Sequence, residues 1–166
     1  MSDFGMELRV IDELDNVLCV KPSEEIHKEG LLHRALHILV FNSAGELYVR
    51  ERSPCMELYP GVWTTSVGEH VFVDETYDKT AHRALWEFLG LETPVSFVGK
   101  TRVHDSIENE LVAVYTSNAD AIPHLNKDHS AEGHYLALTD VQATIDQGKT
   151  TPHLAAAVQL FRETAA

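Results

Sequence analysis

One helical pattern set between short strand-like runs constrains the fold of this chain more than any other feature. Residues 76–89 place apolar side chains at helical spacing on one face, and Gly90 follows them as a helix stop. Two further helices are predicted near the end of the chain, over 140–147 and over 153–164, the latter starting behind Pro152. Strands interleaved with a few helices predict an α/β fold, in which helices cover both faces of a mixed sheet.

The strand-like runs are short, rich in β-branched residues and separated by turn residues. The polar turn at 42–45 predicts a hairpin between the third and the fourth of them. Lys21–Gly30 is polar and is expected to form a loop or a short helix, and Thr139 is a candidate cap for the helix that follows it. The expected strands cover residues 8–11, 17–20, 37–41, 46–50, 62–67, 95–98, 111–115 and 134–138.

Length, charge and apolar patterning exclude several classes of protein. A chain of 166 residues has room for one ordinary domain, so residues 1–166 are expected to form a single domain. With 13 basic and 26 acidic residues the net charge is −13, which repels nucleic-acid backbones at long range. No run approaches the ~20 apolar residues of a membrane helix, and the acidic N-terminus shows no signal peptide. We therefore expect a cytoplasmic protein that binds neither nucleic acid nor membrane, with ordinary thiols at Cys19 and Cys55.

The predicted helix at 76–89 carries the first candidate site. Arg83 and Glu87 stand four residues apart and therefore share a helix face, and Glu75 lies just before the helix. A helix carboxylate can hold a hard cation such as Mg²⁺, which in turn can bridge phosphate oxygens. A surface ion pair, worth ~0.3–0.5 kcal/mol, explains the same spacing.

A second candidate site lies at Glu108 and Glu110, which alternate on a predicted strand and so point to one face. They could share a metal ion, or one could serve as a general base. An exposed acidic strand start is the plain alternative. His27, His33 and His70 are scattered along the sequence and do not have the spacing of a zinc module.

The order of these residues resembles the Nudix superfamily. Its box reads Gly, five residues, Glu, seven residues, then Arg-Glu-apolar-any-Glu-Glu-any-Gly-apolar. In residues 68–91, GEHVFVDETYDKTAHRALWEFLGL, seven residues separate Glu75 from Arg83, and the Gly and apolar positions at the end also match. The segments GLLHRALHILVFNSAGELYVRERS and YPGVWTTSVGEH, with ENE at 108–110, are similar to the isopentenyl-diphosphate isomerase-like branch. The resemblance covers most of the chain from residue 7 onward and implies a Nudix fold, an α/β/α sandwich with a mixed β-sheet.

The box departs from the family pattern at several positions. Glu69 stands where the box has its first Gly, and Gly68 comes one residue early. Ala84 and Phe88 replace two of the three helix carboxylates that hydrolytic members use on metal, so that Glu87 alone is left. Because ligand charge sets affinity at such sites, Mg²⁺ binding on the helix should be weak unless the neighbouring strand supplies carboxylates.

The isomerase-like branch implies a different metal site. Isomerases of this type hold a metal ion with three histidines and two glutamates. Carried over residue by residue, this set would be His27, His33, His70, Glu108 and Glu110. The resemblance also implies that Arg52 binds substrate phosphate, whereas Met56 and Ala84 stand where the family has basic residues.

The isomerase chemistry itself lacks its acid–base group in this chain. The family places a proton-transfer cysteine two residues before the metal-binding histidine, and here that position is Gly68. A tryptophan that shields the carbocation-like intermediate has no match after Thr151-Pro152. Allylic isomerisation is therefore disfavoured.

Three functions follow from this resemblance. The leading hypothesis is a Nudix hydrolase-like enzyme that uses Mg²⁺ or Mn²⁺ to hydrolyse a small-molecule diphosphate. In it Glu87 would hold Mg²⁺, Arg83 would orient Glu75, and Glu110 or Glu108 would complete the metal shell or act as base. The alternatives are an isopentenyl-diphosphate isomerase homologue, and a non-catalytic binding module that keeps the fold and recognises a phosphorylated ligand.

Overall fold

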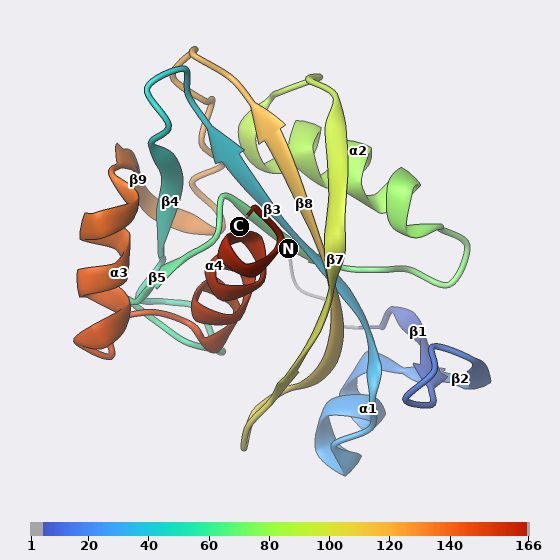
Figure 1. Cartoon of the computed structure of the whole chain (residues 1–166). Coiled ribbons are helices and arrows are strands. Elements are labelled where there is room, and N and C mark those ends of the chain that lie inside the picture. Colours follow the sequence, from blue (N-terminus) through green and yellow to red (C-terminus); the bar gives the residue numbers. More distant parts are fainter. Residues whose placement is uncertain (1–4, 166) are drawn as a thin grey trace.

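The strand β3 (His33–Phe41) forms the centre of the molecule. The computed structural model describes residues 5–165. In it β3 is buried over almost its whole length, as its continuous apolar run indicates. It pairs in parallel with β8 (Asn109–Asn118) (Figure 1) and antiparallel with β6 (Val67–His70). Within the described residues, the strands form one nine-stranded mixed sheet.

The remaining strands extend this sheet in three directions. β1 (Glu7–Ile11) joins the start of β3 and pairs antiparallel with β2 (Val17–Pro22). β7 (Val95–His104) pairs antiparallel with β8 over most of its length. β4 (Leu47–Arg52) pairs antiparallel with both β5 (Trp63–Thr64) and β9 (Ser130–Leu136).

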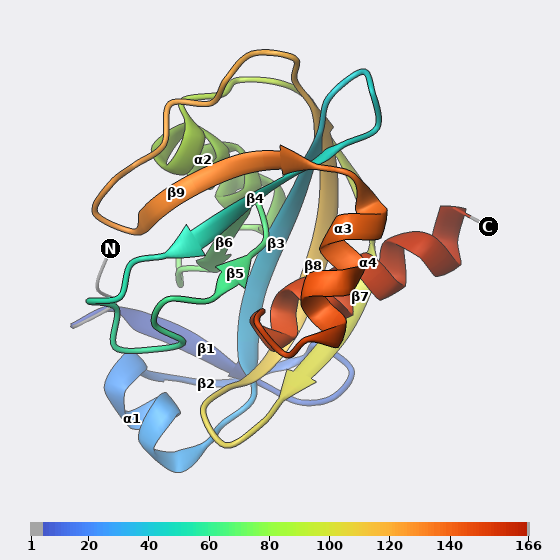
Figure 2. The same cartoon turned by 90° about the vertical axis from the view of Figure 1, so that its left-hand side faces the viewer.

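The expected hairpin between β3 and β4 is present only at its turn. The two strands pair at Phe41 and Leu47 and then separate, so that β4 runs beside β9 (Figure 2). Because β3 is flanked by β6 and β8, its hydrogen-bonding edges are already occupied. The hairpin prediction is therefore wrong beyond the first residue pair.

The strand expected over 62–67 is divided into β5 and β6. At the break, the Ser66 hydroxyl accepts a hydrogen bond from the Val40 amide and donates one to the Tyr48 carbonyl. The chain crosses at this point from the β4 side of the sheet to the β3 side. Ser66 thus pairs with backbone groups of both strands at the crossing.

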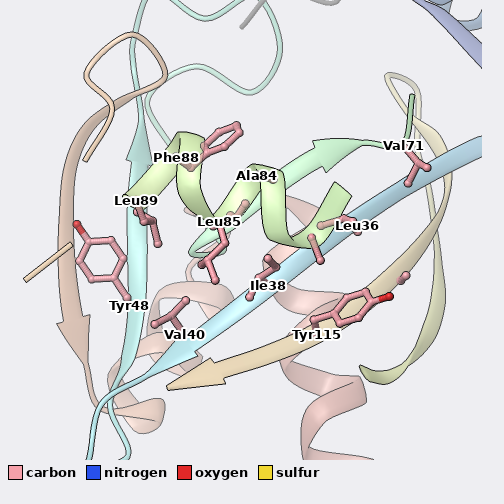
Figure 3. Close-up of a cluster of buried hydrophobic side chains, with 13 residues drawn as sticks. Leu36, Ile38, Val40, Tyr48, Val71, Ala84, Leu85, Phe88, Leu89 and Tyr115 are labelled. Carbon is pink, nitrogen blue, oxygen red and sulfur yellow. The ribbon is translucent and has the colours of Figure 1, made fainter. Parts of the chain in front are cut away.

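The helix α2 (Tyr77–Leu89) covers one face of the sheet and follows the sequence prediction closely. The Thr76 hydroxyl caps it by accepting from the Lys79 amide, and Gly90 ends it in a left-handed conformation with φ of 65°. Its apolar face packs on side chains of β3, β4, β6 and β8 (Figure 3). Figure 3 labels this cluster at Leu36, Ile38, Val40, Tyr48, Val71, Ala84, Leu85, Phe88, Leu89 and Tyr115.

Two helices near the C-terminus pack on the opposite face. α4 (Pro152–Ala165) begins at Pro152 as predicted, and with α3 (Leu138–Asp146) it buries a second apolar cluster. α3 begins at Leu138, which the sequence placed in a strand, so Thr139 lies inside the helix and is not its cap. None of the helices in residues 5–165 is long and apolar enough to cross a membrane.

The polar segment before β3 forms a short helix, α1 (Ser23–Glu29), which is one of the two structures expected there. Gly30 closes it with φ of 66°, and the buried Ile26 packs against β1. The helix thereby places the side chain of His27 near the beginning of β3.

Candidate functional site

Three histidines and a glutamate that lie far apart in the sequence converge beside the start of β3. His27 belongs to the last turn of α1, His33 begins β3, His70 ends β6 and Glu108 lies just before β8. One ligand atom from each of these four residues lies within 4.8 Å of the other three. The spacing in sequence did not suggest a metal module, because the sheet and not a local motif brings these residues together.

The strand register explains this convergence and adds Glu110 to it. His33 is the direct neighbour of Glu110 in the parallel β3–β8 pair, and Ala35 is the neighbour of His70 in the β3–β6 pair. The carboxylate Oε2 of Glu110 lies 3.3 Å from His70 Nε2 and 3.8 Å from His33 Nε2. We call His27, His33, His70, Glu108 and Glu110 the histidine–glutamate cluster.

Glu108 completes this cluster from the other side. Its Oε2 lies 3.2 Å from His27 Nε2 and 3.7 Å from His33 Nε2. Glu108 is 5% exposed and Glu110 3% exposed, so the alternative of an exposed acidic strand start is wrong.

Backbone contacts orient two of the imidazoles toward the centre of the cluster. The Nδ1 of His27 donates to the Ser23 carbonyl at 2.8 Å, and the Nδ1 of His33 donates to the Leu31 carbonyl at 2.9 Å. In neutral rings this leaves both Nε2 atoms as bare lone pairs. These two Nε2 atoms and Glu108 Oε2 are buried without a hydrogen-bond partner, an arrangement that a bound cation satisfies.

The ionisation of these groups reflects both burial and mutual contact. Burial lowers the pKa of His33, and the nearby His70 lowers it further. The carboxylate of Glu108, 3.2 Å from the ring, raises the pKa of His27 in spite of burial. Burial alone would raise the pKa of Glu110, but the charges and hydrogen bonds of His153 and His70 hold it well below its usual value.

The residues of the box form a second group, with Glu69 on β6, Glu75 just before α2, and Arg83 and Glu87 on α2. The Nε of Arg83 donates to both carboxylate oxygens of Glu75, at 3.0 and 3.1 Å. Its Nη1 lies 3.0 Å from Glu87 and 3.3 Å from Glu69. We call these four residues the Arg83 cluster.

The guanidinium is the cation of the Arg83 cluster. Burial opposes the charge of Arg83, but the hydrogen bond to Glu75 and the charges of Glu75 and Glu69 outweigh it and raise its pKa. The guanidinium also covers the ring of Phe72 at 4.3 Å, and its Nη2 is buried without a hydrogen-bond partner. Glu87 is paired with this guanidinium, and the side chain of Glu87 is 38% exposed.

Two positions where the chain departs from the family pattern are explained by their neighbours. A Cβ added to Gly68 would lie 2.5 Å from the Cε1 atom of His37, so this site has no room for a side chain. Phe88 is buried, and its ring lies 5.1 Å from the guanidinium of the buried Arg50.

Arg52, the candidate phosphate ligand, lies near the histidine–glutamate cluster. Its Nε donates to the Leu58 carbonyl at 2.9 Å. Burial lowers its pKa, while Glu108 and Glu110 are close enough to act against that shift. The positive charge of Arg52 thus lies close enough to Glu108 and Glu110 to interact with both carboxylates.

Sequence reasoning missed His37 and His153, two buried histidines next to the cluster. Their rings stack with centroids 4.7 Å apart, and His153 contacts Glu110. Ten histidines in the chain gave these two no distinguishing signal. Only the packing of α4 against the start of β8 identifies them.

Comparisons with known proteins found a family and relatives that match most of the chain. A family model of the NUDIX domain matches residues 31–155. An isopentenyl-diphosphate Delta-isomerase 2 of Photorhabdus laumondii is 30% identical over 84% of this chain and 81% of its own length. A protein of Pseudomonas aeruginosa described as an uncharacterized Nudix hydrolase is 31% identical over 92% of this chain and 89% of its own length.

A solved structure shows the same fold. The crystal structure of a Deinococcus radiodurans protein superposes with a TM-score of 0.78, at 24% identity, and covers 94% of this chain and 98% of that one. The α/β sandwich with its mixed sheet is thus shared with a protein of distant sequence.

Proposed function

The chain belongs to the NUDIX domain family, and from that premise we propose that it hydrolyses a diphosphate-containing small molecule with a divalent metal ion held by the histidine–glutamate cluster. One observation carries the proposal: two imidazole nitrogens and a carboxylate oxygen are buried, have no hydrogen-bond partner and face a common point. Polar atoms in this state are costly unless they bind a cation.

The donor atoms favour a transition-metal ion over Mg²⁺. Mg²⁺ prefers oxygen ligands and keeps much of its water, whereas this cluster offers three imidazoles and two carboxylates. Members of the family generally use divalent metals. Of the two ions expected from the sequence, Mn²⁺ therefore suits the histidine–glutamate cluster better than Mg²⁺ does.

Each residue of the cluster has a definite part in this proposal. His27, His33, His70 and Glu108 would bind the ion, and Glu110 would bind it through Oε2. A bound divalent ion supplies a Lewis acid and lowers the pKa of its water. Arg52 would hold a phosphate group beside the cluster, because its charge lies within reach of the buried carboxylates.

The box residues stay a separate prediction. Arg83 would orient Glu75, the role that the resemblance implies, through the bifurcated hydrogen bond from its Nε to both carboxylate oxygens. Glu87, however, already has a cation in Arg83, so an ion at Glu87 would have to compete with the guanidinium. We therefore place the metal of the reaction at the histidine–glutamate cluster.

Isopentenyl-diphosphate isomerisation is the second candidate, because the convergent ligands are those that the isomerase-like branch implies. Gly68 argues against it on two grounds. Glycine has no titratable group, and the imidazole of His37 fills the space where a side chain at 68 would begin. Gly68→Cys alone is thus not a restoring change, since His37 would also have to move.

A panel of diphosphate substrates with Mn²⁺ and with Mg²⁺ tests the proposal, scored for phosphate release and for isomerisation. We expect Mn²⁺-dependent hydrolysis that falls by about 100-fold or more in Glu108→Gln. Glu132→Gln, on the exposed side of β9, is the matched control. Isomerisation without hydrolysis would establish the second candidate, and tight ligand binding without turnover would establish the binding module.

A further inference from the structure

A pair of buried histidines extends from the histidine–glutamate cluster into the protein. His37 lies on β3 and His153 on the first turn of α4, and both side chains are buried. Their rings stack with an interplanar angle of 19°. The ring of Tyr59 lies nearly perpendicular to that of His153, with centroids 5.7 Å apart, so His153 contacts a second ring as well.

His153 contacts the cluster through a single short hydrogen bond. Its Nε2 donates to Oε1 of Glu110 at 2.6 Å. The other oxygen of the same carboxylate, Oε2, is the one that faces His33 and His70. The two oxygens of Glu110 thus have separate partners, and the contact with His153 fixes the rotation of the carboxylate.

The second histidine of the pair is fixed in its turn. The Thr65 hydroxyl donates its only hydrogen to the Val67 carbonyl at 2.9 Å, so it can only accept from His37 Nδ1, which lies at 2.6 Å. Gly68 leaves the space that this ring fills. The imidazole of His37 is consequently locked in position and orientation beneath His153.

We propose that His153 is a positioning residue of the metal centre, which holds Glu110 so that Oε2 points to the ion, and that His37, Thr65 and Gly68 form its support. This inference rests on the proposed metal site but not on the reaction. It assigns a place to the two histidines that the sequence comparison leaves without a role. A hydrogen bond to the atom of a ligand residue that does not bind the metal holds that residue in its orientation. Losing such a hydrogen bond commonly weakens metal affinity by about 10–100-fold.

Metal binding by the purified protein tests this inference without any substrate. The Kd for Mn²⁺ is measured by calorimetry for the wild type and three variants. His153→Phe keeps an aromatic ring on His37 but has no hydrogen for Glu110. His153→Gln restores a donor on a chain of similar length, and His134→Phe changes an exposed histidine as the control.

We expect a Kd for Mn²⁺ that is 10–100-fold higher in His153→Phe, largely recovered in His153→Gln and unchanged in His134→Phe. Thermal unfolding of the metal-free proteins shows that each variant is folded. An unchanged Kd in His153→Phe would overturn the positioning role. So would an equal loss in His153→Gln, because then only the imidazole packing matters.

The two proposals fail in different ways. If the wild type binds no Mn²⁺, both the metal site and the role of His153 are wrong. If it binds Mn²⁺ with the expected pattern among the variants but hydrolyses no diphosphate, the positioning role stands and the proposed reaction is wrong.

Discussion

The histidine–glutamate cluster and the Arg83 cluster are both rich in carboxylates, yet they balance their charge in opposite ways. In the Arg83 cluster one guanidinium lies within 3.3 Å of three glutamates. In the histidine–glutamate cluster two buried carboxylates face imidazoles, and three of the facing atoms have no hydrogen-bond partner. The comparison shows that the carboxylates around Arg83 have their own cation, whereas those beside β3 are arranged for one from outside.

The largest expected effect is that Mn²⁺ stabilises the folded protein by binding at the histidine–glutamate cluster and not at the Arg83 cluster. Mn²⁺ at about 100 times its Kd should add about 2.7 kcal/mol to the free energy of unfolding, or ~5–10 °C in Tm. Thermal unfolding with Mn²⁺ and with a chelator measures this shift. Glu108→Gln should abolish the shift, and if that variant is stabilised as much as the wild type, the ion binds elsewhere.

Removing the resident cation should make the two clusters alike. Arg83→Met leaves Glu69, Glu75 and Glu87 without their partner and should lower the free energy of unfolding by about 2 kcal/mol. Millimolar Mg²⁺ should then stabilise the variant more than the wild type, because only the variant has uncompensated oxygens around position 83. Equal responses of the two proteins to Mg²⁺ in denaturant titrations would contradict the charge-balance argument.

The variant Glu87→Gln distinguishes two roles of Glu87, that of an ion-pair partner of Arg83 and that of a metal ligand. Because Glu87 is partly exposed and lies four residues from Arg83, its loss should cost ~0.5 kcal/mol or less in stability. The Kd for Mn²⁺ should stay within about twofold of the wild type, since the binding atoms are those of the other cluster. A fall of the order of 100-fold in kcat would instead show that Glu87 holds an ion during turnover.

The smallest effect concerns pH and the metal-free protein. The contact with Glu108 raises the pKa of His27 above 6.5, so the stability it contributes is complete below about pH 6.5 and is lost as the pH rises through the raised pKa. Metal affinity should change in the opposite direction, because the proton must leave before the ion binds. Unfolding of the metal-free wild type and His27→Gln between pH 6 and 8 measures the first trend. If the difference between the two proteins does not shrink with rising pH, the pair with Glu108 is not charged.

Local signals in the sequence located α2 and the start of α4 but not the arrangement of the sheet. The apolar spacing of α2, with Thr76 before it and Gly90 after it, predicted that helix almost to the residue. The order of the strands depends on which edges remain free once β6 and β8 flank β3, and nothing in the turn at 42–45 records this. The hairpin prediction failed for that reason.

In the candidate site, too, some residues could be predicted from the sequence and others only from the packing. The resemblance named the five residues of the histidine–glutamate cluster, because their order along the chain follows a known set. His153 and His37 act on that cluster from α4 and from the middle of β3, and their contact depends on how a helix packs against a sheet. Among the box residues, Glu87 was predicted as a metal ligand and Arg83 as the residue that orients Glu75. Only the structure shows that the guanidinium of Arg83 joins Glu69, Glu75 and Glu87.

The parallel pairing of β3 with β8 also determines when a newly made chain can acquire its ion. His33 leaves the ribosome well before its strand partner Glu110, by roughly 4–15 s at ~5–20 residues per second. Until β8 has been synthesised and has docked beside β3, the chain has imidazoles but neither of the buried carboxylates. Metal loading should therefore be a late event in biogenesis, and a chain truncated before β8 should show none of the metal-dependent stabilisation of the complete protein.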